Sequence, residues 1–529
     1  PNLRCSSTGF PKGSLSQIVM SHYYRFELCR LIVLLLRLKG IEDVMANTLF
    51  VSHRGRDHGN SCNKRIMPCQ TVRHAATKTN EGDRVFIDFA QGRPYKECED
   101  VTKAKYPIEL TKSISFHGMN GSTELQCSKW YSLFKIKSPG RNITHVKFIN
   151  LIISNSNIVV RLDQGTLSEL VLQNLVVRNN QIGLYGKNSI YCSILMINAT
   201  FERTFGGIHL QCLNLTANIM SGIFKSTPVL LKNIGGKPSR WQNMQIWVEN
   251  TIVDGENTQI CAELLAIEPI TATLNVTITN SQFKDHIANC EVKDHISTLL
   301  INSRHLCVEI YVKIFLSNLL IQNNNNTGHV LVLRPGYQQS TEVEIILRDS
   351  TFSNNSVALW VGPYYRSFPV EISTILLSTF VDNFYEQFKA IGAAAIYFAT
   401  GTSHISACRF VDNRSGKNPF TGVVTISKSA RVTFSDTYFE NKQTEFQLNQ
   451  LFALGNQKLR FAGHNTFNLI NLKEKQSVFI RAPTALSTGV IIDKNFNILC
   501  PQGFKLSPQL FCSPLKTRNM CYYINVKCE

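Results

Sequence analysis

Short apolar runs separated by polar residues fill most of the chain between about residues 106 and 480. Val, Ile, Leu, Phe and Thr dominate these runs, as in "HVKFINLIIS" and "EVEIILRDSTF", and Asn, Ser, Asp and Gly interrupt them. Residues with β-branched or aromatic side chains favour strands. Amphipathic helical periodicity of any length is missing. The pattern therefore predicts an all-β body built from short strands.

One phrase recurs in this body, in which a phenylalanine precedes polar residues that end in Asn. It occurs four times, at Phe352, Phe380, Phe410 and Phe439, with intervals of 28, 30 and 29 residues. Earlier in the chain, Ile153, Val177 and Phe201 lie 24 residues apart in matching contexts. A fixed period of this size indicates one supersecondary unit that is stacked on copies of itself.

The stacked unit is interpreted as one coil of a parallel β-helix. Each coil would pair its strands with the coils above and below, so the repeated phenylalanines become core residues. The Asn residues would lie at corners, because Asn tolerates the left-handed backbone and can bond its neighbour in the next coil. A leucine-rich repeat is the competing interpretation for "LSELVLQNL" at 167–175, but its Asn comes one place early and the motif does not recur.

The opening of the chain has a different character. A strand is expected at Leu49–Ser52, followed by a polar loop that a disulfide between Cys62 and Cys69 could clip. "QTVRHAATKT" predicts a short amphipathic helix, and "RVFIDF" predicts the next strand. A solenoid needs its first coil covered, because an open end exposes apolar core and unpaired strand edges. We expect this segment to be the N-terminal cap.

The order "FVS…G…SC…PC-x-T-V-x-x-A…GD-x-V-x-I" resembles the opening of extracellular pectin-lyase-like proteins, above all the large secreted or cell-surface β-helix proteins of animals. The resemblance covers about residues 49–90 and, more loosely, the repeats. It implies a right-handed parallel β-helix and raises the hypothesis of a polysaccharide lyase or glycoside hydrolase. The polygalacturonase motifs Asn-Thr-Asp, Asp-Asp, Gly-His-Gly and Arg-Ile-Lys, and the pectate lyase signature, are absent.

No catalytic, cofactor or metal residues are therefore assigned. Asp285–His286 and Asp294–His295 come nearest to an acid/base pair, but they lie nine residues apart, which is less than one coil. No HExxH, phosphate-binding loop or dinucleotide fingerprint occurs.

Charge and cysteine content bear on the surroundings of the protein. The formal net charge is +18 and the pI is about 9.2, which favours acidic partners such as anionic glycans. No Lys/Arg run marks a nucleic-acid patch, so a generally basic surface and a dedicated anion site both stay open. Sixteen cysteines without a CxxC favour disulfides and an oxidising, extracellular location.

Two sets of modified residues are predicted. The disulfide candidates are Cys62, Cys69, Cys500, Cys512, Cys521 and Cys528. The N-glycosylation sequons are Asn120, Asn142, Asn198, Asn214, Asn275, Asn325, Asn354 and Asn413. For a third set the sequence leaves stapling and core packing equally open; it comprises Cys192, Cys212, Cys261, Cys290, Cys307 and Cys408.

Four segments are expected. Residues 1–46 hold upstream residues and a signal peptide that begins at Met20, with Leu31 to Leu36 as its apolar region. Residues 47–105 form the cap and first strands, and 106–485 form the β-helix. Residues 486–529 resemble the start of an EGF or ephrin-receptor-like Cys-rich module, which looks truncated and whose continuation could carry a membrane anchor. No stretch in this chain is long and apolar enough to span a membrane.

These expectations favour a non-catalytic extracellular recognition, adhesion or matrix module that contacts an anionic glycan or a cell-surface protein. A divergent polysaccharide lyase or hydrolase is the alternative. Three or more carboxylates meeting in one lateral groove would favour that alternative.

Overall fold

The structure is a computed structural model of the chain. It describes residues 46–88, 93–98, 107–119, 123–127, 131–140, 142–234, 242–269, 273–288, 296–302, 311–326, 328–334, 342–362, 371–385, 392–415, 421–441, 449–453, 459–469, 478–481, 490–492, 497–499, 504–506, 512–514 and 527–528.

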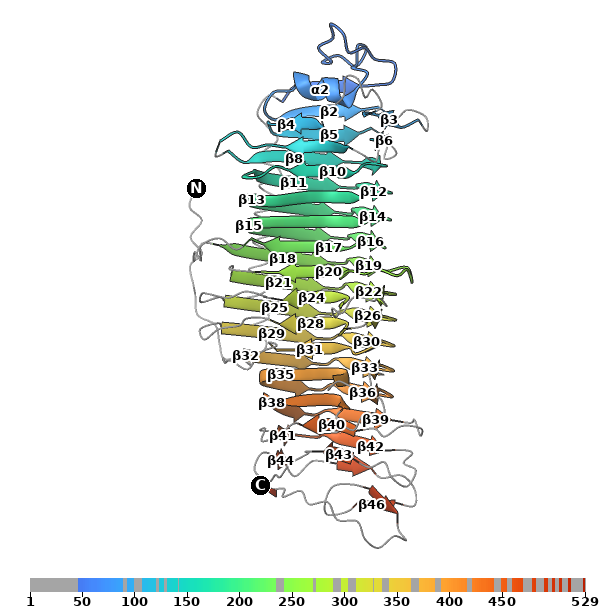
Figure 1. Ribbon diagram of the computed structural model, residues 1–529, viewed down its shortest axis with the longest axis vertical. Helices are drawn as coiled ribbons and strands as arrows, with labels where there is room; N and C mark the ends of the chain where they lie inside the picture. The colour runs from blue at the N-terminus through green and yellow to red at the C-terminus, as the bar shows by residue number, and fades with distance from the viewer. Residues whose placement is uncertain are drawn as a thin grey trace, which may run out of the picture.

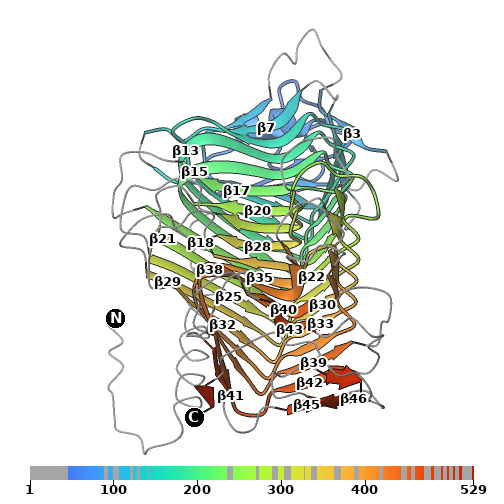
Figure 2. The same ribbon diagram turned by 60° about the horizontal axis from the view of Figure 1, so that its bottom comes forward.

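The described chain forms a right-handed parallel β-helix, as the repeats predicted. Its strands stack as rungs along the long axis, with α2 at the N-terminal end (Figures 1 and 2). Each coil runs through three strands, and each strand pairs in parallel with its counterparts in the neighbouring coils. The three stacks of strands are here named the first, second and third faces. Crossovers between parallel strands of one sheet are almost always right-handed.

The strands of the first face are β4 (Ile108–Leu110), β7 (Ser132–Ile136), β10 (Ile158–Leu162), β17 (Val229–Asn233), β20 (Leu265–Glu268), β24 (Leu299–Asn302), β28 (Leu331–Arg334), β31 (Leu359–Val361), β40 (Asn449–Ala453) and β43 (Val478–Arg481). The second face contains β1 (Thr48–Val51), β2 (Asp83–Ile87), β5 (Ile114–Gly118), β8 (Thr144–Ile149), β11 (Leu167–Gln173), β18 (Asn243–Glu249), β21 (Thr273–Thr279), β25 (Tyr311–Ser317), β29 (Glu342–Arg348), β32 (Glu371–Leu376), β41 (Leu459–Ala462), β44 (Val490–Ile492) and β48 (Lys527–Cys528). Four long strands bend from the first face into the second: β13 (Ile182–Ile197), β15 (Gly206–Met220), β35 (Gly392–Ser406) and β38 (Thr421–Ser435).

The third face is a separate sheet of very short strands. They are β3 (Tyr95–Lys96), β6 (Thr123–Gln126), β9 (Leu151–Ser154), β12 (Val176–Arg178), β14 (Thr200–Glu202), β16 (Ile223–Lys225), β19 (Ile252–Asp254), β22 (Gln282–Lys284), β26 (Leu320–Gln322), β30 (Thr351–Ser353), β33 (Thr379–Val381), β36 (Arg409–Val411), β39 (Tyr438–Asn441), β42 (Thr466–Leu469) and β45 (Asn497–Leu499). Three small pairs complete the set: β23 (Ile287–Ala288) with β27 (Asn325–Asn326), β34 (Phe384–Tyr385) with β37 (Arg414–Ser415), and β46 (Phe504–Leu506) with β47 (Cys512–Pro514).

The repeated phenylalanines stack in the core behind the third face. Phe352, Phe380, Phe410 and Phe439 occupy matching positions in adjacent strands and are fully buried. Their ring centroids are 4.7, 5.0 and 4.6 Å apart, and the planes are within 11° of parallel. The same row contains Ile153, Val177 and Phe201 in the earlier, tighter coils. Both repeat intervals therefore describe one ladder, and the core interpretation of the phenylalanines is confirmed.

The corners of the coils hold most of the residues with a left-handed backbone. Between the second and third faces this conformation recurs at Asn150, Asn174 and Asn198, with φ values of 56, 50 and 53°. The Asn174 amide donates to Oδ1 of Asn150 at 2.8 Å, and the Asn198 amide donates to Oδ1 of Asn174 at 2.9 Å. Asn is the residue that tolerates this conformation best after Gly. The predicted corner role of Asn is confirmed here.

A second amide ladder lies inside the solenoid, where the sequence predicted only corners. Asn324, Asn355, Asn383 and Asn413 are all buried. Each of the first three donates its side-chain N–H to Oδ1 of the next, at 2.8, 3.0 and 2.9 Å. In the first three copies of the repeated phrase, Asn354, Asp382 and Asp412 take the left-handed corner, and the Asn after each one enters the interior.

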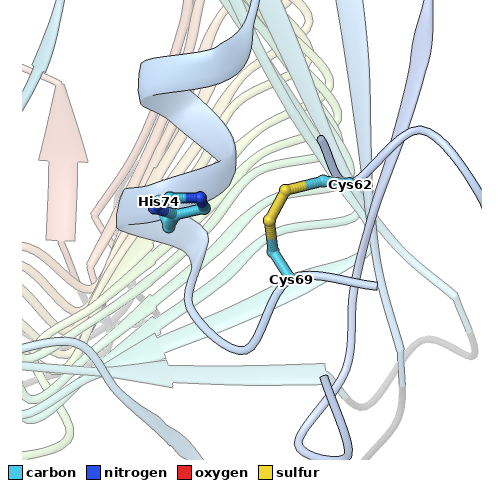
Figure 3. A group of neighbouring side chains, drawn as sticks. All are labelled: Cys62, Cys69 and His74. Carbon is cyan, nitrogen blue, oxygen red and sulfur yellow. A yellow bond between two sulfur atoms is a disulfide. The ribbon is translucent and has the colours of Figure 1, made fainter. Parts of the chain in front are cut away.

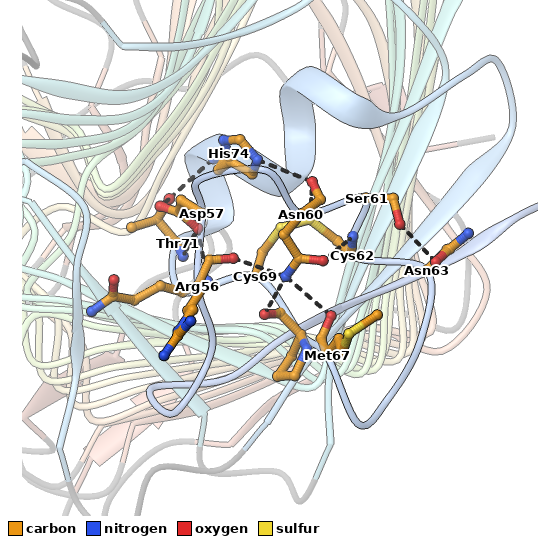
Figure 4. The surroundings of a disulfide bond; sticks show 12 residues. Arg56, Asp57, Asn60, Ser61, Cys62, Asn63, Met67, Cys69, Thr71 and His74 are labelled. Carbon is orange, nitrogen blue, oxygen red and sulfur yellow. Dashed lines mark hydrogen bonds between the residues drawn. A yellow bond between two sulfur atoms is a disulfide. The ribbon is translucent and has the colours of Figure 1, made fainter.

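The N-terminal cap contains α2 (Val72–Lys78), close to the predicted helix. Its first turn is held by two carboxylates: Asp57 accepts from the backbone of Gln70 and Thr71, and the buried Glu97 accepts from Val72 and Arg73. Val72 and Ala75 pack into the core. Cys62 and Cys69 form a disulfide beneath the helix (Figure 4). The prediction that a helix covers the first coil is confirmed.

Strand stacking also continues beyond residue 485, where the sequence predicted the Cys-rich module to begin. β44 pairs with β41, β45 pairs with β42, and β48 pairs with β44. Among the described residues of this segment, β46 and β47 are the one pair of strands that is antiparallel. In the part of the chain that the structure describes, no helix has the length and hydrophobicity needed to cross a membrane.

Candidate functional site

One line of outward-facing positions runs along the first face from coil to coil, and we call it the outer row. Alternate residues of a strand point to opposite sides, so each coil contributes one residue here while its neighbours enter the core. In register order the outer row contains Glu109, Lys135, Arg161, Tyr185, His209, Leu230, Ala266, Leu300, Val332, Trp360, Tyr397 and Thr425.

Aromatic rings gather at the C-terminal part of the outer row. Trp360 on β31 and Tyr397 on β35 stack with centroids 4.3 Å apart, and His329 meets Trp360 edge-on at 4.7 Å. The guanidinium carbon of Arg334 lies 4.7 Å from the centroid of Trp360. The four side chains are each half-buried, and we call them the aromatic platform. Ring stacking and cation–π contact hold them in one arrangement.

Apolar side chains support this platform from the N-terminal side. Ala266, Leu300 and Val332 are 3, 4 and 2% exposed, and Leu230 and Trp360 pack against them. Trp360 also donates its indole N–H to the carbonyl of Gly362 at 2.9 Å. This hydrogen bond fixes the edge of the indole, and Tyr397 stacks on its face.

Cations gather at the opposite, N-terminal part of the outer row. Arg161 and the nearby Lys187 are exposed, and neither forms an ion pair with a carboxylate among the described residues. Tyr185 and His209 lie between them and the apolar stretch, with rings 5.6 Å apart. Burial, followed by the charges of Lys232 and Lys187, lowers the pKa of His209. This end of the row therefore combines the cations Arg161 and Lys187 with the rings of Tyr185 and His209.

Several described carboxylates on the faces form ion pairs with a cation. Asp163 pairs with Lys135 at 3.2 Å and Glu268 with Lys232 at 3.0 Å on the first face. On the third face Arg178 pairs with Glu124 at 3.1 Å and Lys284 with Asp254 at 2.9 Å. Lys284 also lies 3.4 Å from the carboxylate of Asp285, so Asp254 and Asp285 share one cation, and the other three pairs are one-to-one contacts between coils.

The Asp285–His286 pair divides between two environments. Asp285 takes a left-handed corner and accepts from the Asn323 amide at 3.1 Å. His286 is fully buried, with Nδ1 3.1 Å from the Thr298 hydroxyl and Nε2 3.2 Å from the Ile260 carbonyl. Burial lowers the pKa of His286 to about 4. The two side chains form no acid/base dyad with each other, and Asp294 and His295 lie outside the described residues.

Cys62, Cys69 and His74 bring possible metal-ligand atoms within 4.8 Å of one another (Figure 3). Within the described part of the chain, no other group of His, Cys, Asp and Glu side chains has this geometry. The disulfide joins the two sulfurs, whereas a zinc site needs thiolates. His74 Nε2 lies 3.4 Å from the carbonyl of Asn60. The group is a disulfide with a packed histidine beside it.

The remaining cysteines divide as follows. Cys98–Cys127 and Cys192–Cys212 are disulfides between neighbouring coils, and Cys261 is also disulfide-bonded. Cys408 is a buried free thiol. Cys5, Cys29, Cys290, Cys307, Cys500 and Cys521 lie outside the described residues. For Cys512 in β47 and Cys528 in β48, the structure describes only the backbone.

The predicted N-glycosylation sequons differ in how exposed their Asn side chains are. Asn142, Asn198, Asn325 and Asn354 are exposed, and Asn214 and Asn275 are half-buried. Asn120 lies outside the described residues. Asn413 is 1% exposed and donates its side-chain amide to the carbonyl of Phe380 at 2.7 Å, within the interior ladder. A glycan on that nitrogen would break the ladder, so we do not expect one at Asn413 in the folded protein. The other sequons stay predictions.

The outer row was missed by sequence reasoning, although a signal for it exists. Trp360 and Tyr397 lie in "ALWVG" and "AIYFA". In each segment the residues on both sides of the aromatic residue are buried. Strict alternation along these strands would have placed both rings outside. The register that aligns them cannot be read from a chain whose coils differ in length.

Comparison with known proteins finds only remote similarities. No family model matches the chain, and no curated protein sequence matches it. Among solved structures, the catalytic domain of an alpha-1,3-glucanase in complex with nigerose aligns at 12% identity with a TM-score of 0.30, covering 82% of this chain and 67% of that chain. A rhamnogalacturonan lyase aligns at 11% identity with a TM-score of 0.19, covering 87% of this chain and 83% of that chain. An alginate lyase aligns at 11% identity with a TM-score of 0.19, covering 85% of this chain and 89% of that chain. Similarities this low assign neither a function nor site residues.

Proposed function

We propose that this chain is a non-catalytic extracellular β-helix that recognises anionic glycans along the outer row of its first face. The observation that carries the proposal is the aromatic platform. Flat stacked rings on a rigid sheet suit the apolar faces of sugar rings, as aromatic side chains combine a large contact area with a fixed geometry. The Arg334 guanidinium beside them supplies a planar donor that matches carboxylates and sulfates.

The spacing of the coils supports a linear ligand. Neighbouring strands lie about 4.8 Å apart, which is close to the length of one pyranose unit. Five coil steps separate His209 from Trp360, so the cationic end and the aromatic platform lie roughly 24 Å apart. The side chains between them, Ala266, Leu300 and Val332, are 3, 4 and 2% exposed, so a glycan chain would contact each end separately. The net charge of +18 would attract a polyanion to either end.

The proposed location rests on the disulfides, which persist in oxidising compartments. A secreted or cell-surface protein with glycans at exposed sequons fits that location. The same proposal includes the signal peptide in residues 1–46, the Cys-rich module in 486–529, and the likeness of residues 49–90 to β-helix proteins of the animal cell surface.

Affinity electrophoresis of the secreted protein in gels that contain polygalacturonate, heparin or neutral dextran tests the proposal. Retardation by the anionic polymers that fades at moderate salt is expected, because salt screens exposed charges. Trp360→Ala should weaken retardation about tenfold or more, as truncation of a central aromatic anchor does. Trp247→Ala on the second face is the matched control.

Equal retardation of both variants would overturn the assignment to the outer row. Turnover of polygalacturonate, alginate or a glycosaminoglycan would overturn the non-catalytic part and leave a divergent lyase or hydrolase as the function.

A further inference from the structure

The disulfide-clipped loop at the N-terminal end of the solenoid exposes apolar side chains that the fold does not use. Ile66 is 87% exposed and Met67 is 51% exposed. The loop lies beyond the first coil, next to α2 (Figure 1). We propose that this loop docks the solenoid, N-terminal end first, onto an anionic lipid membrane surface. This inference is independent of the glycan site on the first face.

The loop is built rigidly. Met67 donates its backbone N–H to the carbonyl of Lys64 at 3.0 Å, which closes a turn with Arg65 and Ile66 at its two central positions. The Asn60 amide donates to the carbonyls of Arg56, Met67 and Pro68 at 2.8, 3.1 and 2.7 Å (Figure 4). The Cys62–Cys69 disulfide closes the base. The exposed Ile66 is thus presented on a fixed turn, where no rearrangement is needed before contact.

Cations surround the apolar tip. Arg54, Arg56, Lys64 and Arg65 are exposed, and no described carboxylate forms an ion pair with them. The one acid in the loop, Asp57, accepts from the backbone of Gln70 and Thr71 and from the Thr71 hydroxyl. A cluster of Lys and Arg around exposed apolar residues matches a membrane interface, where apolar tips enter the acyl boundary and cations remain among anionic headgroups.

The anionic lipid surface is favoured over an acidic protein by the shape of the tip. Protein interfaces need a broad complementary patch, commonly about 800 Å² on each partner. Here the apolar part consists of two adjacent side chains on a projecting turn, which a fluid bilayer accommodates without shape complementarity. The tip alone gives weak, reversible binding, as expected for a single small insertion.

Co-sedimentation of the full chain with vesicles tests the proposal. Vesicles of phosphatidylcholine with 30% phosphatidylserine should retain the protein at low salt, and pure phosphatidylcholine vesicles should not. The double variant Ile66→Ser/Met67→Ser should bind about tenfold more weakly. Lys64→Gln/Arg65→Gln should bind about 30-fold more weakly. All four positions are exposed, so the variants should retain the wild-type melting curve.

Two controls separate this site from other surfaces. Phe205→Ser removes an apolar side chain that is 88% exposed at a distant corner, and it should bind vesicles like the wild type. Trp360→Ala should also bind vesicles normally, because the glycan site is separate. Retention on pure phosphatidylcholine, equal losses in Phe205→Ser and the tip variants, or no retention at low salt would each overturn the proposal, the last in favour of an acidic protein as the occupant.

Discussion

Individual Asn residues have two distinct roles in this solenoid, depending on which side of a corner they occupy. Asn354 takes the left-handed corner and stays exposed. Asn355, the next residue, is buried and bonds across coils in both directions. The first role relieves backbone strain, and the second satisfies carbonyls that would otherwise be buried without a donor.

The interior ladder should therefore be far more sensitive to substitution than the corner. Asn355→Ala removes the donor to the Ile321 carbonyl and the acceptor of two Asn324 N–H groups. Each unsatisfied buried group costs about 1–3 kcal/mol, so a loss of about 3 kcal/mol or more in the free energy of unfolding is expected. Urea denaturation measures it. Asn354→Gly, which keeps the corner conformation, should change stability by only a few tenths of a kcal/mol.

His286 should make the protein sensitive to acid. Burial lowers its pKa to about 4, whereas an unfolded histidine titrates near 6.5. Between these values the unfolded chain binds more protons, so acid favours unfolding. The contribution is complete above pH 6.5 and is lost as the pH falls toward 4, by about 2 kcal/mol between pH 7 and pH 5.

Urea denaturation of the wild type and His286→Gln at both pH values checks this prediction. The variant should show a pH dependence that is flatter by that amount, whatever its absolute stability. An identical pH dependence in the two proteins would show that His286 is not the group responsible.

At the scale of the elements, three short strands per coil hold the molecule together only because their side chains stack. The strands of the third face are mostly three residues long, and each places one residue in the core row. A strand this short has few backbone bonds of its own. Its stability comes from the ladder of rings behind it and from the paired coils on either side.

Phe380→Ala tests that dependence. The ring is fully buried between Phe352 and Phe410, so removal leaves a cavity that the neighbouring rings cannot fill. A loss of about 3–5 kcal/mol in the free energy of unfolding is expected. Thr379→Ala, an outward position of the same strand, is the control. A loss below about 1 kcal/mol for Phe380→Ala would contradict a close-packed ladder.

The sequence predicted the elements that depend on local repetition. The Phe ladder, the corner Asn residues and the capping helix all follow from spacing and residue type. The interior Asn ladder did not, because Asn355 and Asn354 look alike until the backbone turns between them. The Cys192–Cys212 disulfide could not be predicted either, since cysteine pairing depends on which coils become neighbours.

For the whole molecule, the faces differ in what they offer to a partner. The third face carries ion pairs between coils, which neutralise each other. The first face combines Arg161 and Lys187, which form no ion pair with a described carboxylate, with the aromatic platform farther along. This arrangement could not be predicted from the sequence, because the outer row joins residues from coils that range from 21 to 37 residues in length. Only the register of the folded strands brings them into line.

Hydroxyl-radical footprinting with and without polygalacturonate tests the central claim most directly, because it reports which aromatic side chains a bound glycan covers. Oxidation of Trp360 and Tyr397 should fall when the polymer is present at low salt, and oxidation of Trp247 on the second face should stay the same. Unchanged oxidation of Trp360 and Tyr397 under conditions where the polymer is bound, or protection of Trp247 in their place, would contradict a glycan site on the first face.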